Sequence, residues 1–119
     1  MTAVEPQPKL FFNPSCSKCR TADSLLHERG VDATLVRYLE QAPTVDELRG
    51  LMTRLGIDDP RAMMRTAEPV YSQLGLADAT AERVLEAIVQ QPILLERPIF
   101  IVGDRAVIAR PPERLLELL

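Results

Sequence analysis

Two cysteines carry the most reactive chemistry in this sequence. Both cysteines of the 119-residue chain, Cys16 and Cys19, lie in one polar stretch, residues 13–20. A short apolar run precedes the stretch and a helical pattern follows it, so Cys16 is expected at or near a helix N-cap. Unpaired backbone N–H groups and the helix dipole favour a thiolate there, and the thiolate is the nucleophilic form of cysteine. The sequence therefore predicts that Cys16 is a nucleophile.

The rest of the stretch is suited to binding an anion beside that nucleophile. Asn13 and Pro14 break the preceding strand and are expected to shape the loop. Backbone N–H groups at a helix start cradle oxyanions, and we expect Ser17 and Lys18 to contribute to such a site. Lys18 and Arg20 add positive charge within a turn of the thiol. A nucleophile and an anion site are thus predicted at the same place.

Cys19 admits three interpretations. A disulfide across C-x-x-C at a helix start is feasible, which makes Cys19 a candidate resolving thiol for Cys16. A zinc site needs four ligands, and His27 is the one further soft ligand in the chain, so no metal is expected. A pair of merely packed cysteines fits poorly with so polar a loop. Redox chemistry is the favoured interpretation.

Three arginines form the second candidate element. Arg65 follows a short helical pattern, Arg97 precedes a core strand, and Arg110 follows the last strand. Taken alone, each of these arginines would be expected to be ordinary surface charge. As a set they fall at the ends of elements, where guanidinium groups are suited to binding a tetrahedral oxyanion.

The amino-acid composition limits the classes of protein to which this chain can belong. Hydrophobic residues make up 46% of the chain and charged residues 26%, which is ordinary globular composition. The net charge of −3, with no long basic run, argues against direct nucleic-acid binding. Residues 1–9 lack a signal-peptide pattern and no apolar stretch reaches membrane-spanning length, so we expect a cytoplasmic protein that does not enter the membrane.

The elements that must position these residues follow a recognisable order. Residues 1–8 are expected to be a flexible tail, and residues 9–119 a single domain. Four strands are predicted, at residues 10–12, 34–38, 99–102 and 106–109. A helix over residues 21–29 links the first two as a parallel βαβ unit, and the last two form a hairpin. The order βαβ, then ββα, predicts an α/β protein with a thioredoxin-like mixed four-stranded sheet.

Helices fill the middle of the chain, so an all-helical insertion is predicted at about residues 43–91. Thr44 and Glu47 form a capping-box pattern at the start of the first of these helices, and Gly56 ends it. Residues 66–76 are expected to be irregular. A last helix is expected to begin at Pro111-Pro112 and to cover the sheet with its leucines, Leu115, Leu116, Leu118 and Leu119.

At this level of detail the sequence resembles the glutaredoxin-coupled arsenate reductase family over residues 9–119. The resemblance is carried by these segments: Asn13-Pro14-Ser15-Cys16-Ser17-Lys18-Cys19-Arg20, Val36-Arg37-Tyr38-Leu39-Glu40, Arg65-Thr66-Ala67-Glu68-Pro69, Gln73-Leu74-Gly75-Leu76, Gln91-Pro92-Ile93-Leu94-Leu95-Glu96-Arg97-Pro98-Ile99 and Ala109-Arg110-Pro111. Jointly these segments are far more specific than a lone C-x-x-C.

The resemblance implies an activity and a role for each site residue. It implies an arsenate reductase in which Cys16 is the nucleophile that forms a thio-arsenate adduct, and in which Arg65, Arg97 and Arg110 bind the oxyanion. It also implies a cis peptide bond before Pro98. No cofactor is expected to stay bound. Glutathione or another thiol would act as co-substrate, with glutaredoxin or a thioredoxin-type protein as reductant, and the protein is expected to be a monomer.

Two positions depart from the family pattern. Family members often carry a His just before Asn-Pro, where this chain has Phe12, and glutathione-dependent members commonly lack a cysteine at Cys19. A C-x-x-C at this place is similar to the Spx-type transcriptional regulators, which bind RNA polymerase and use the cysteine pair as a redox switch. A Cys16–Cys19 switch of that type, and a general thiol oxidoreductase without arsenate activity, are the alternatives.

Overall fold

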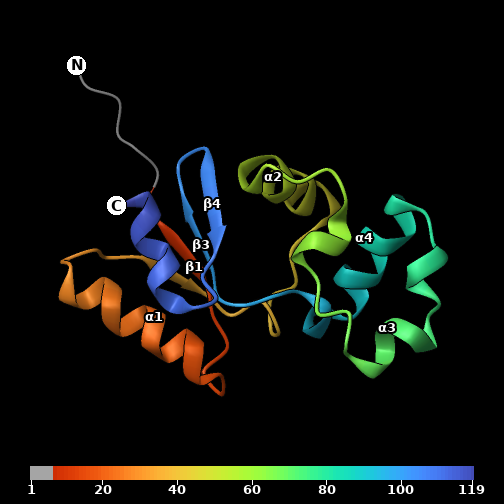
Figure 1. Cartoon of the computed structure of the whole chain (residues 1–119), viewed down its shortest axis with the longest axis horizontal. Helices are drawn as coiled ribbons and strands as arrows, with labels where there is room; N and C mark the ends of the chain where they lie inside the picture. The colour runs from red at the N-terminus through yellow and green to blue at the C-terminus, as the bar shows by residue number, and fades with distance from the viewer. Residues whose placement is uncertain (1–6) are drawn as a thin grey trace. The chain divides into compact units, whose positions relative to one another are not determined.

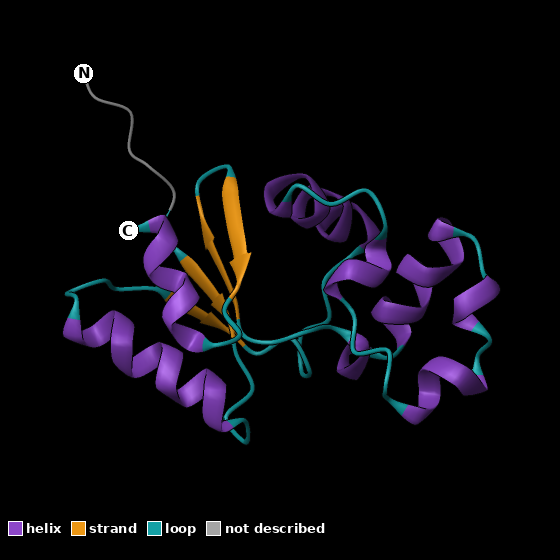
Figure 2. Ribbon diagram, viewed as in Figure 1, coloured by secondary structure: helices purple, strands orange, loops and turns teal. Residues whose placement is uncertain are grey.

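The computed structural model describes residues 7–119, and contacts divide the chain into two compact units. One unit runs up to Arg37 and resumes from Arg97 to Leu119; the other is Tyr38–Glu96. The first unit contains all the described strands and the second is built from helices (Figures 1 and 2). Within residues 7–119, no helix combines the length and the apolar character needed to span a bilayer.

The first unit is organised around a mixed sheet with the strand order β2-β1-β3-β4. Strand β1 pairs in parallel with β2 and antiparallel with β3, and β3 and β4 form a hairpin. Helix α1 makes the crossover between β1 and β2. The predicted α/β, thioredoxin-like fold class is therefore confirmed. The bounds are β1 Lys9–Phe11, α1 Ser17–Glu28, β2 Thr34–Val36, β3 Ile99–Val102 and β4 Arg105–Ile108.

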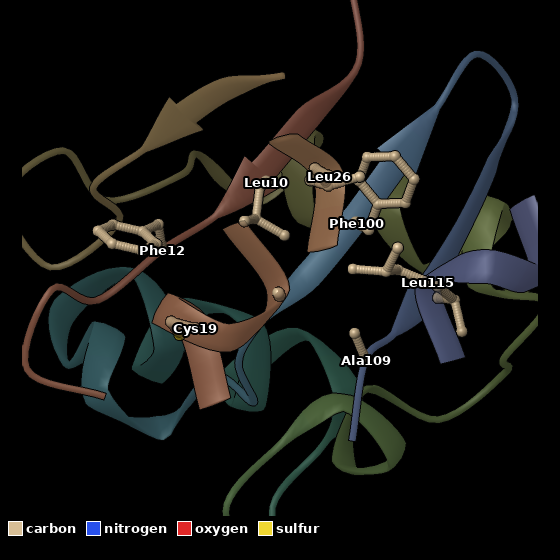
Figure 3. Close-up of a cluster of buried hydrophobic side chains, with 9 residues drawn as sticks. Leu10, Phe12, Cys19, Leu26, Phe100, Ala109 and Leu115 are labelled. Atoms are coloured by element: carbon tan, nitrogen blue, oxygen red, sulfur yellow. The ribbon is translucent and has the colours of Figure 1, made fainter. Parts of the chain in front are cut away.

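One face of this sheet is covered by α1 and by the C-terminal 3₁₀ helix η4, Pro112–Leu118. The strands β1, β3 and β4 each place one side chain of a matched row, Leu10, Phe100 and Val107, on this face. Cys19 of α1 and Leu115 of η4 pack against the row (Figure 3). The complete cluster is Leu10, Phe12, Cys19, Ala22, Leu26, Phe100, Val107, Ala109 and Leu115. The second half of the C-x-x-C stretch is thus part of the hydrophobic core.

The chain ends and short elements differ from the expectation. The start of α1 is Ser17 rather than residue 21, with Cys16 as the N-cap residue. Of the four C-terminal leucines, Leu119 was expected on the sheet, but it is the last residue and is 53% exposed. Residues 1–6 of the expected tail lie outside the described residues. The side chain of Gln7 donates to the Asp32 carbonyl, and Pro8 accepts from Thr34 N–H.

The second unit begins with a well-capped helix. The Thr44 hydroxyl accepts from Glu47 N–H at 3.1 Å, and the Glu47 carboxylate accepts from Thr44 N–H at 3.1 Å, so the predicted capping box forms. Gly56 ends the helix in the left-handed conformation, which glycine adopts without steric cost. The elements of this unit are α2 Val45–Leu55, η1 Pro60–Met63, α3 Pro69–Gln73, η2 Leu76–Asp78, α4 Ala81–Gln90 and η3 Pro92–Leu94.

The stretch over residues 66–76, expected to be irregular, contains a short helix. Helix α3 begins at Pro69, whose fixed φ angle is suited to the first position of a helix. Arg61 stabilises the turns that follow: its guanidinium donates to the carbonyls of Leu76 and Ala79 and pairs with Asp59. The Arg61 side chain thus bonds to two carbonyls of this segment, of which that of Leu76 also accepts from Ala79 N–H.

Candidate active site

A tight turn leads from strand β1 into helix α1 and presents Cys16. The Asn13 carbonyl accepts from Cys16 N–H at 2.9 Å, and the Asn13 side-chain oxygen accepts from Ser15 N–H at 3.0 Å. Arg20 secures the turn from the helix side, because its Nη1 donates to the Pro14 carbonyl at 2.8 Å. Cys16 is the N-cap of α1, in extended backbone conformation, and is half-buried. Its sulfur therefore sits at the positive end of the helix.

The surroundings of Cys16 favour its ionised form. Partial burial alone would raise the pKa of the Cys16 thiol. The backbone N–H and thiol of Cys19, the positive charge of Arg97 and the backbone N–H of Lys18 act in the opposite direction and prevail, so the pKa of Cys16 lies below its usual value. The first turn of α1 contains no acidic residue that would oppose this effect. Cys16 is thus suited to nucleophilic attack.

Cys19 has the opposite character. It is fully buried, with no exposed surface, one helical turn after Cys16. Burial raises the pKa of Cys19 to about 12, and the neighbouring Cys16 adds to that effect against the backbone N–H of Asn13 and the charge of Arg97. Both cysteines are free thiols. Within residues 7–119, no three His, Cys, Asp or Glu side chains are grouped as a metal site requires.

Arg97 and Arg110 lie together in the same unit as the cysteines. Arg110 Nη1 donates to the carbonyl of Arg97 at 2.9 Å. Arg97 itself has two buried nitrogens, Nε and Nη1, without a hydrogen-bond partner among residues 7–119. Buried N–H donors are nearly always paired in folded proteins, so these two are suited to an anionic ligand. The peptide bonds before Pro98 and Pro111 are both cis.

Arg65 belongs to the helical unit and has partners of its own. Its Nη1 lies 2.6 Å from a Glu68 carboxylate oxygen, and its Nε lies 4.0 Å from a Glu96 oxygen. Main-chain bonds fix the segment: Arg65 N–H donates to the Leu94 carbonyl at 2.7 Å, and Glu96 N–H donates to the Met63 carbonyl at 2.9 Å. Among the expected oxyanion ligands, Arg65 is therefore held by carboxylates, whereas Arg97 is not.

The remaining expected residues lie in the loop. Ser17 and Lys18 occupy the first two positions of α1, and their side chains are exposed. Sequence reasoning treated Arg20 only as a nearby charge and missed its bond to the Pro14 carbonyl. It also named one cis bond and not the second, although Arg110-Pro111 repeats the Arg-Pro pair of Arg97-Pro98.

Comparison with known proteins gives a family match for this chain. The sequence profile of the ArsC family matches residues 11–118. The chain belongs to the ArsC family. An arsenate reductase of Neisseria meningitidis is 42% identical over 112 residues, which cover 92% of this chain and 96% of that protein. An arsenate reductase of Escherichia coli is 35% identical over 92% of this chain and 79% of its own length.

Solved structures give the same result for the fold. The structure of an arsenate reductase from Vibrio cholerae superposes with a TM-score of 0.92 at 38% identity. The superposition covers 94% of this chain and 97% of that chain. The ArsC family match thus extends over both units, and the resemblance stated from the sequence motifs is confirmed.

Proposed function

We propose that this ArsC-family protein is an arsenate reductase in which Cys16 is the nucleophile. The observation that carries the proposal is the pairing of a thiol with a lowered pKa and an arginine whose buried Nε and Nη1 have no partner in residues 7–119. An oxyanion bound beside Cys16 would give these two donors the partners that they lack. The arsenate reductase relatives, 42% and 35% identical, support arsenate as the oxyanion.

In the first step, the Cys16 thiolate attacks the arsenic of arsenate. A sulfur–arsenic bond forms, an arsenic–oxygen bond breaks, and the oxygen leaves as water after it takes up protons. Arg97 and the N–H groups at the start of α1 offset the negative charge on the remaining oxygens. Arg110 fixes Arg97 through the 2.9 Å bond to its carbonyl and has further N–H donors for the oxyanion.

In the second step, an external thiol attacks the Cys16 sulfur of the adduct. A sulfur–sulfur bond forms, and the electron pair of the sulfur–arsenic bond passes to arsenic, which leaves as arsenite. A second thiol then reduces the mixed disulfide and restores Cys16. Overall, arsenate and two thiols give arsenite, one disulfide and water. Glutathione with glutaredoxin fits this scheme. A thioredoxin-type reductant would serve instead if Cys19 displaced arsenite and formed a Cys16–Cys19 disulfide.

Arg65 is proposed as the third oxyanion ligand, on the family resemblance. Its ion pairs with Glu68 and Glu96 mean that an oxyanion must compete with carboxylates for this guanidinium. The relatives described above are named as reductases, so we propose the reductase over the Spx-type switch. A cytoplasmic location, a monomeric state and the lack of direct nucleic-acid binding stay predictions.

The test is arsenite formation by the purified protein. Arsenate is supplied with either glutathione plus glutaredoxin or thioredoxin plus its reductase, and Cys16→Ser is the blank. We expect arsenite with at least one system and none with the variant. Arsenite formation that survives Cys16→Ser, or no arsenite with either system from a protein whose Cys16 is reactive, would overturn the proposed function.

A further inference from the structure

We propose that Glu68 is a positioning residue that sets the affinity of the oxyanion site by holding Arg65 in the absence of a ligand. Its carboxylate takes, on the Arg65 guanidinium, the place of the oxyanion, so an incoming oxyanion must displace it. This inference rests on the proposed role of Arg65 as an oxyanion ligand. It goes beyond that role because it assigns the affinity to a residue that does not itself bind the oxyanion.

The backbone around Glu68 holds its carboxylate beside Arg65. Glu68 N–H donates to the Arg65 carbonyl at 3.1 Å, which closes a turn between the two residues. Arg65 is held as well, because its N–H donates to the Leu94 carbonyl at 2.7 Å, next to an isolated bridge between Met64 and Leu95. The side chains at the two ends of the turn therefore meet, and Glu68 Oε1 lies 2.6 Å from Arg65 Nη1.

The local structure at Glu68 does not otherwise require a carboxylate. Glu68 is the N-cap of α3, yet its side chain makes no capping hydrogen bond. Glutamate is also not among the residues preferred at an N-cap, which are serine, threonine, aspartate, asparagine and glycine. The Glu68 side chain is 19% exposed, so it is not simply a solvated surface charge. The ion pair with Arg65 is thus the contact that accounts for a glutamate at this position.

Arg65 keeps donors for an oxyanion while it is paired with Glu68. The Glu68 contact is at Nη1. Glu96, another nearby carboxylate, lies 4.0 Å from Nε, which is too far for a hydrogen bond. The Arg65 side chain is 29% exposed, and a guanidinium has five N–H donors. An oxyanion can therefore approach Arg65, and the negative charge of Glu68 opposes its binding until the ion pair opens.

The experiment measures how well an oxyanion protects Cys16 from alkylation, with Glu68→Gln as the test variant. Glutamine keeps an acceptor for Arg65 and removes the charge. Protein free of reductant is treated with iodoacetamide at increasing concentrations of arsenate and, in a second series, of phosphate. Because a partly exposed ion pair is modest in strength, we expect the half-protecting concentration of each anion to fall by about fivefold. Glu86→Gln is the matched control, since Glu86 is an exposed carboxylate on α4 of the same unit, and it should leave both concentrations unchanged.

A further variant tests whether Glu68 acts through Arg65. Arg65→Gln should raise the half-protecting concentrations, and Glu68→Gln added to Arg65→Gln should then bring no gain in protection. In steady-state kinetics, Glu68→Gln alone should lower KM for arsenate about fivefold without raising kcat, a split that a merely structural role would not produce.

The outcomes that would overturn the inference are distinct. Unchanged or weaker protection in Glu68→Gln would mean that Glu68 does not compete with the oxyanion. A gain that persists in the Arg65→Gln background would mean that Glu68 acts through the general field of the protein. A gain for arsenate without the same gain for phosphate would contradict competition at Arg65, which shifts the affinity for every anion by one factor. Absence of protection in the wild-type protein would overturn the proposed function together with this inference.

Discussion

Arg97→Met should make the protein more stable and much less active. Arg97 keeps two buried nitrogens, Nε and Nη1, without a partner in the described part of the chain. An unpaired buried donor costs about 1–3 kcal/mol, and methionine offers a stem of similar length without a donor. Because Arg97 has two such donors, we expect the free energy of unfolding to rise by about 2–6 kcal/mol.

The same change should impair arsenate reduction. Two charge-assisted hydrogen bonds to an oxyanion contribute about 1.5–3 kcal/mol each, so kcat/KM for arsenate should fall by at least about 100-fold. The loss of the Arg97 charge should also raise the pKa of Cys16. Chemical denaturation measures the change in the free energy of unfolding, and arsenite formation measures the change in kcat/KM.

Arg105→Met is the matched control for Arg97→Met. Arg105 begins β4 and is exposed. In Arg105→Met, neither the free energy of unfolding nor the activation free energy derived from kcat/KM should change by more than about 0.5 kcal/mol. An Arg97→Met variant that is less stable and reduces arsenate at the wild-type rate would refute the reasoning, because it would mean that Arg97 serves the fold rather than the anion.

Three further changes test other parts of the account. Arg110→Lys keeps the charge but loses the guanidinium whose Nη1 donates to the Arg97 carbonyl, so KM for arsenate should rise about tenfold in steady-state kinetics; an unchanged KM would contradict the positioning of Arg97 by Arg110. Thr44→Ala removes the capping box of α2 and should cost about 1 kcal/mol in urea unfolding, whereas exposed Thr66→Ala should cost little. Because the pKa of Cys19 is about 12 in the folded protein and about 8.5 in an unfolded chain, the folded state binds more protons between those values. The unfolding free energy should then fall as pH rises through that window, more in wild type than in Cys19→Ser; parallel curves for the two proteins would contradict the burial of a protonated thiol.

Local patterns predicted the framework of the site. The break at Asn13-Pro14 between an apolar run and a helical pattern was sufficient to place Cys16 at a helix start, because strands and N-caps have strong local signals. The capping box at Thr44 was likewise readable from residues three apart. The parallel βαβ unit and the hairpin of β3 and β4 were likewise predictable from the chain order of the elements.

Contacts between residues that are far apart in the sequence could not be predicted from such local patterns. The Arg110 bond to the Arg97 carbonyl joins residues 13 apart, and the lack of partners for two Arg97 nitrogens depends on everything packed around them. Arg20 reaches Pro14 only because the turn directs that carbonyl toward the helix. The contrast between half-buried Cys16 and fully buried Cys19 likewise depends on tertiary packing.

The most direct measurement of the central claim is protection of Cys16 from alkylation by arsenate. The wild-type protein is treated with iodoacetamide in the absence of any reductant, with and without arsenate, and Cys16 modification is followed by mass spectrometry. Arg97→Met is the comparison, and chloride at matched ionic strength is the control. We predict that arsenate slows alkylation of Cys16 in wild type and has no effect in Arg97→Met. An alkylation rate that arsenate leaves unchanged in wild type would contradict an oxyanion site at Cys16 and Arg97.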